Sequence, residues 1–139
     1  LGRFVSGSPR HPGGILALAR LMLIQGKARE AKILLSNFPA SHEFSTAQQL
    51  KPVVQAFLWL DSVREAPQDA LEAAYRNSLK LARSGKILLA LDGFLDILRK
   101  DKDYRDDEVR EVYLGLLEVL GEAHPEVRQY RADLTNVLF

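Results

Sequence analysis

The chain has 139 residues, nearly equal numbers of acidic and basic side chains, and no cysteine. This length suits a single domain, and the 47% hydrophobic content is ordinary for a protein that buries a core. The net charge of +1 argues against a general electrostatic grip on nucleic acid or on an anionic membrane. The lack of cysteine excludes disulfides, thiolate metal sites and thiol nucleophiles.

The first fourteen residues contain four glycines and two prolines and show little hydrophobic periodicity. We expect residues 1–14 to form a linker or a cloning remnant ahead of a helical domain at residues 15–139. The chain does not begin with Met, and it shows neither a signal peptide nor an apolar stretch near 20 residues. We therefore expect a piece of a longer cytoplasmic protein with no membrane-spanning helix.

From Ile15 onward, apolar residues recur at the spacing of a helix face, and no segment reads convincingly as a strand. Two prolines are expected in the first turns of helices, where proline is tolerated: Pro52 in a helix starting near Leu50, and Pro125 in the last helix. The sequence thus predicts about seven helices, namely 15–25, 27–36, 50–60, 68–84, 86–100, 109–120 and one opened by residues 124–125.

Two predicted helix pairs resemble each other, one turning at Gly26 and the other at Gly85. Glycine permits a tight turn, and small residues before and after it allow two antiparallel helices to approach closely. The matching positions are Ala19 and Ser78 before the turn, and Ala31 and Ala90, then Leu35 and Phe94, after it. The pattern resembles the 34-residue tetratricopeptide repeat (TPR), although these glycines are 59 residues apart. The predicted fold is all-α: stacked antiparallel helical hairpins in a short, irregular solenoid.

Three stretches support a closer resemblance: LARLMLIQGKAREAKILLSNFP, ALDGFLDILRKDKDYRDDEVREVYLGLLEVLG and RQYRADLTNVLF. Together they resemble the C-terminal tetratricopeptide domain of bacterial thioredoxin-like co-chaperones, the chaperedoxin (YbbN/CnoX) family. The resemblance implies a preceding thioredoxin-like domain, absent from this chain, and partners that are unfolded client proteins and chaperone machinery. It assigns no redox activity here, because there is no Cys-x-x-Cys.

Two groups of residues are candidates for binding protein. Arg76, Lys80 and Arg83 share one helix face and either form a solvated surface or contact acidic peptide termini. The apolar pair Leu138 and Phe139, with Tyr130 on the same predicted helix, either folds back onto the core or serves as a docking tag.

Two aromatic residues of the predicted helix at residues 50–60 also have two possible placements. We expect Phe57 and Trp59 to belong to the core, the alternative being an apolar groove for unfolded segments.

No residue pattern indicates catalysis or a cofactor. The three histidines, His11, His42 and His124, lack the spacing of metal ligands. Asp92 and Asp96 lie four residues apart on a predicted helix, and we expect a solvated face with Asp96 near Arg99 or Lys100. The function predicted is a non-catalytic protein-interaction module of a co-chaperone. The alternative is a structural or oligomerising module without client binding.

Overall fold

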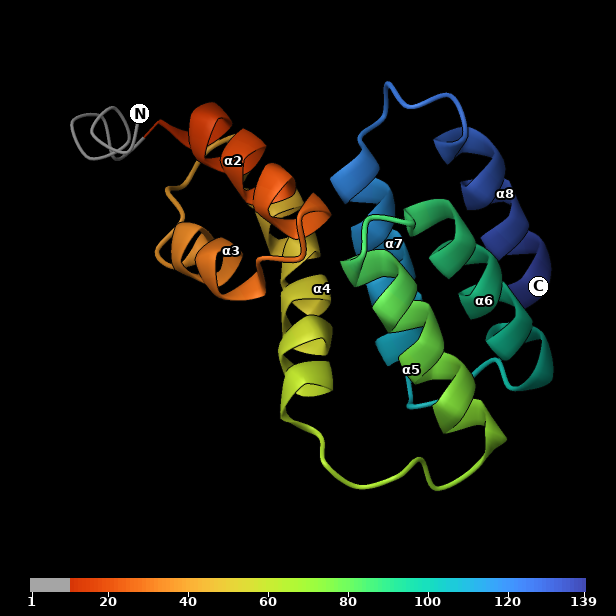
Figure 1. Cartoon of the computed structure of the whole chain (residues 1–139). Coiled ribbons are helices and arrows are strands. Elements are labelled where there is room, and N and C mark those ends of the chain that lie inside the picture. Colours follow the sequence, from red (N-terminus) through yellow and green to blue (C-terminus); the bar gives the residue numbers. More distant parts are fainter. Residues whose placement is uncertain (1–10) are drawn as a thin grey trace.

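A computed structural model describes residues 11–139, which form α-helices and no strand (Figure 1). This confirms the all-α prediction for the described part of the chain. The predicted linker falls mostly in residues 1–10, outside the described residues. The helices, in chain order, are α2 (Pro12–Ile24), α3 (Ala28–Leu35), α4 (Phe44–Ser62), α5 (Ala70–Arg83), α6 (Ile87–Lys100), α7 (Glu108–Leu120) and α8 (Val127–Leu138).

Helix α2 begins at Pro12, three residues before the start predicted at Ile15. Pro12 occupies the first turn, where its missing N–H costs nothing. The ring of His11 supplies the cap, because its Nδ1 accepts a hydrogen bond from the Gly14 backbone N–H at 3.0 Å. Gly13 and Gly14 therefore belong to the helix rather than to a linker.

The prediction that a helix begins near Leu50 with Pro52 in its first turn is wrong. Helix α4 begins at Phe44, and Pro52 lies in its interior. Pro52 removes the N–H that would bond the carbonyl of Gln48, but Gln48 is exposed, so water can satisfy that carbonyl. Ala47 and Leu50 are completely buried, and their packing holds the turns ahead of the proline.

The last helix also begins later than predicted. Pro125 lies in the connection before it, and α8 starts at Val127. The connection leaves α7 through Gly121, whose φ is +87°. It is then closed by a hydrogen bond from the Glu126 backbone N–H to Nδ1 of His124 at 3.1 Å.

Two hairpins, α2–α3 and α5–α6, turn at the predicted glycines, with φ of +76° at Gly26 and +86° at Gly85. The two turns also meet each other. A Cβ on Gly26 would lie 2.5 Å from the backbone oxygen of Arg83, and a Cβ on Gly85 would lie 3.6 Å from that of Ile24. The end of α2 and the turn of the second hairpin lie side by side in Figure 1. The hairpins are therefore stacked turn against turn.

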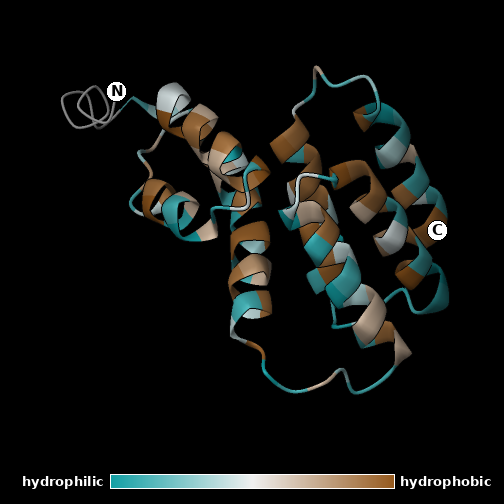
Figure 2. Ribbon diagram, viewed as in Figure 1, coloured by the Kyte–Doolittle hydropathy of each residue, from teal (hydrophilic) through white to brown (hydrophobic). Residues whose placement is uncertain are grey.

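Helix α4 packs against α3 of the first hairpin and α5 of the second, and its most extensive contact is with α7. It lies close to α7 at Gly115, where a Cβ would lie 2.6 Å from the backbone oxygen of Gln49 and 2.7 Å from Cγ2 of Val53. Helix α8 covers α6 and α7. Figure 2 shows hydrophobic residues alternating with hydrophilic ones around each helix, as expected when one side faces neighbouring helices.

Candidate functional site

Trp59 and Phe57, both expected in the core, have different environments. Phe57 is completely buried, as predicted, whereas Trp59 is half-buried at the edge of α4. The Trp59 ring lies 5.9 Å from the Tyr75 ring, and the guanidinium of Arg105 covers it at 4.6 Å from the ring centroid. Arg76 lies over the same ring at 5.5 Å. These are cation–π distances, so two arginines flank Trp59, which lines a mixed polar and apolar pocket of about 480 Å³ with Arg105 rather than an apolar groove.

Glu108 closes this cluster. The Tyr75 hydroxyl donates a hydrogen bond of 2.5 Å to Oε2 of Glu108, and Nε of Arg105 donates to the same oxygen at 3.0 Å. Burial, reinforced by the bond to Glu108, raises the pKa of Tyr75. Arg105 and Asp106 both adopt left-handed backbone conformations, with φ of 55° and 58°. The cluster thus joins α4, α5 and α7 and fixes the turn before α7.

The predicted basic face does not gather into one site. Arg76 turns into the aromatic cluster, pairs with Glu72, and donates to the backbone oxygen of Glu65 at 2.7 Å. Arg83 pairs with Asp61 at the end of α4. Of the three predicted residues, only Lys80 has no ion pair with the described residues. Helical spacing placed the three on one helix, but it could not show that Asp61 on α4 pairs with Arg83, while Glu72, four residues before Arg76 on the same helix, pairs with Arg76.

The predicted acidic pair is divided between two structural roles. Asp96 pairs with Arg99 at 2.7 Å, one of the two partners expected from the sequence. Asp92 instead accepts a hydrogen bond of 2.8 Å from the Tyr130 hydroxyl. Burial, with help from Asp92, raises the pKa of Tyr130 to about 12. Residues 11–139 contain no group of three side chains placed to hold a metal ion.

The last turn of α8 separates the two apolar residues that the sequence singled out. Leu138 is half-buried and packs against the core, whereas Phe139 is 97% exposed. Tyr130 is half-buried, and its backbone oxygen accepts a hydrogen bond of 2.6 Å from the Tyr113 hydroxyl. Tyr130 therefore positions α8, and Phe139 is the exposed apolar side chain of the predicted set.

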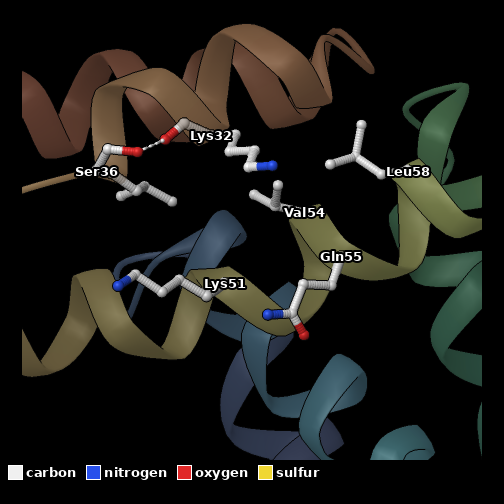
Figure 3. A pocket seen from close by; sticks show the side chains of 7 residues that line it. Lys32, Ser36, Lys51, Val54, Gln55 and Leu58 are labelled. Atoms are coloured by element: carbon white, nitrogen blue, oxygen red, sulfur yellow. Dashed lines mark hydrogen bonds between the residues drawn. The ribbon is translucent and has the colours of Figure 1, made fainter.

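A groove between α3 and α4 was not predicted from the sequence. It has a volume of about 270 Å³ and is lined by Lys32, Leu35, Ser36, Lys51, Val54, Gln55 and Leu58. Figure 3 shows Lys32 reaching from α3 over Val54, while Lys51 extends along α4. Leu35 and Val54 form a buried apolar floor. The helical spacing within α3 and within α4 could indicate each half of this lining, but not that the two helices face each other.

The family model for the tetratricopeptide repeat matches residues 58–139, more than half of the chain. The chain belongs to the tetratricopeptide repeat family. Such TPR domains generally mediate contacts between proteins, and the stacked hairpins agree with this architecture. Comparisons with curated proteins and with solved structures found no match. Within residues 11–139, no helix combines the length and apolar character needed to cross a membrane.

Proposed function

We propose that this TPR domain is the non-catalytic interaction module of a thioredoxin-like co-chaperone, and that it binds unfolded client proteins or a chaperone partner. The family match supports an interaction role, and the resemblance to chaperedoxins supports the choice of partners. The co-chaperone role also assigns a cytoplasmic location and a bacterial source to the intact protein.

The observation that carries the proposal is the arrangement at the end of α8. Leu138 anchors the last turn against the core, and Phe139 projects into solvent with 97% of its surface exposed. Phe139 directly follows the last residue of α8, and its large apolar side chain is available to a partner. Burying it fully in a complex would contribute about 1.5–3 kcal/mol.

The test is direct binding of residues 1–139 to a purified chaperonin, to a purified Hsp70-type chaperone and to a chemically unfolded client. Calorimetry measures the first two interactions, and suppression of light scattering measures the third. Phe139→Ser should weaken binding to at least one of these partners by about tenfold or more, while the circular dichroism spectrum stays unchanged.

The matched control is Ile33→Ser, which removes a 73% exposed apolar side chain from α3. It should change the affinity less than twofold, on the order of 0.4 kcal/mol. Equal losses in the two variants would mean general stickiness rather than docking through α8. Wild-type protein that binds none of the three partners would overturn the proposal and favour the structural alternative.

A further inference from the structure

We propose that the groove between α3 and α4 is a second docking site, which binds a peptide segment of a partner protein with one large apolar side chain flanked by carboxylates. It lies on different helices from the end of α8 and extends the proposed function. Its apolar floor, the two lysines at its rim and the distribution of acids around them favour such a segment.

The floor of the groove suits a single apolar side chain. Leu35 and Val54 are 1% and 3% exposed, and Leu58 is half-buried beside them. The volume of about 270 Å³ is slightly below the range of pockets that hold drug-sized ligands. A leucine-sized side chain fits this space and would cover the apolar atoms that now face water.

The rim is cationic and lacks a counterion from this chain. Neither Lys32 nor Lys51 forms an ion pair within residues 11–139. The acids of α3 and α4 are Glu30 and Asp61. Glu30 is two residues from Lys32 and so points to another side of the helix, while Asp61 pairs with Arg83. Two positive charges therefore border the apolar floor, and carboxylates complement them.

Polar groups at the same rim can bind the backbone of an extended peptide. The Gln55 amide, which lines the groove, forms no hydrogen bond to the described residues and offers both a donor and an acceptor. The Ser36 hydroxyl donates to the Lys32 backbone oxygen at 2.9 Å and can still accept. Charge, apolar fit and backbone hydrogen bonding together favour a peptide over a small anion.

The test uses a short peptide, blocked at both ends, in which one leucine is flanked by four glutamates. Its binding to residues 1–139 is followed by fluorescence anisotropy. The double variant Lys32→Glu with Lys51→Glu should weaken binding by at least about tenfold, and replacing the peptide leucine with serine should do the same. Raising the ionic strength from about 0.05 M to about 0.5 M should weaken wild-type binding several-fold.

The matched control is Lys86→Glu with Lys100→Glu. These exposed lysines lie at the two ends of α6, away from the groove between α3 and α4. This pair carries the same charge change and should leave peptide binding within twofold of wild type, on the order of 0.4 kcal/mol.

Three outcomes would overturn this assignment: no binding of the peptide to wild type, equal losses in the two lysine pairs, or equal binding of an RNA oligonucleotide. Binding of the chaperone and client partners is measured in parallel. If the groove proposal alone is wrong, the protein still binds the chaperone or client partners but not the peptide. If the proposed function alone is wrong, the protein still binds the peptide but none of those partners.

Discussion

Two halves of the molecule hold their helices together by different means. Helices α2, α3 and α4 form the first half, and α5 to α8 form the second. In the first half, the side-chain hydrogen bonds described stay within a few residues of each other, as from Ser36 to Lys32. In the second half, hydroxyl groups bridge distant helices, from Tyr75 to Glu108 and from Tyr130 to Asp92. Apolar packing dominates within the first half, whose Arg20 and Asp61 make polar contacts to Glu118 and Arg83 of the second half.

This difference parallels the family match and the position of the groove. The family model begins at residue 58, near the end of α4, and covers the half with directional polar contacts. Directional contacts specify one register between helices, whereas apolar contacts accept substitutions of similar volume. The groove, with Lys32 and Lys51 at its rim, lies in the first half, which suits a surface that adapts to a partner.

The largest effect is expected where the two halves meet. Gly115→Ala places a Cβ against the backbone oxygen of Gln49 and the side chain of Val53, at 2.6 and 2.7 Å. Backbone atoms of a packed helix cannot move aside, so the variant should lose about 3 kcal/mol of unfolding free energy. Urea denaturation measures this loss.

Gly93→Ala is the control for this contact between α4 and α7, because Gly93 lies within α6 and faces the second half only. Its Cβ would meet the Ser78 hydroxyl at 2.1 Å, but that group can rotate away, and alanine favours a helix. The expected loss is below about 1 kcal/mol. Equal losses of unfolding free energy at Gly93 and Gly115 would show that α4 and α7 pack no more tightly than α5 and α6 do.

The second effect distinguishes the two hairpin turns. Gly26→Ala adds a Cβ 2.5 Å from the Arg83 backbone oxygen, whereas Gly85→Ala adds one 3.6 Å from that of Ile24. Both residues have positive φ, and this costs an alanine about 1–2 kcal/mol. The clash adds to this cost at Gly26 alone, so thermal unfolding should show Gly26→Ala as the less stable variant. The reverse order would mean that the turns do not stack as described.

The third effect tests the polar contacts of the second half. Tyr75→Phe removes the hydroxyl that bonds Glu108 within the aromatic cluster, and should cost about 1–2 kcal/mol in urea denaturation. Tyr130→Phe removes the bond to the exposed Asp92 and should cost about 0.5 kcal/mol or less. A Tyr75→Phe variant as stable as wild type would show that ring packing alone holds the cluster.

The smallest effect is a dependence on alkaline pH. All four tyrosines lie in the second half, and burial raises the pKa of each above the usual value near 10. The folded state therefore keeps protons that the unfolded chain releases, so this contribution to stability is complete below pH ~10 and declines as pH rises through the folded values. Ultraviolet titration should show tyrosinate forming later in folded than in unfolded protein. Coincident titration curves would show that folding does not raise the pKa of these tyrosines.

The sequence was sufficient for the parts of this fold that depend on local chemistry. Gly26 and Gly85 predicted both turns because a tight connection between helices needs positive φ. Pro52 misled the prediction because a local rule for helix starts ignored the tertiary packing of Ala47 and Leu50.

The candidate sites depend on contacts between helices, which periodicity does not reveal. Arg83 pairs with Asp61 of α4 across two helices, whereas the pair between Arg76 and Glu72 has i,i+4 spacing within α5 and could be inferred from the sequence. The groove required knowing that α3 lies on α4. Phe139 is the exception. The sequence left two alternatives for it, folding back onto the core or serving as a docking tag, and the exposed side chain does not fold back.

The stacking of the two hairpin turns has a consequence for how this chain can vary in length. Turns between helices usually accept inserted residues, because they project into solvent. Here the Gly26 turn lies against the backbone of Arg83, and the Gly85 turn approaches that of Ile24. An insertion in either turn would separate the hairpins, so relatives should vary in length at the exposed α4–α5 connection instead.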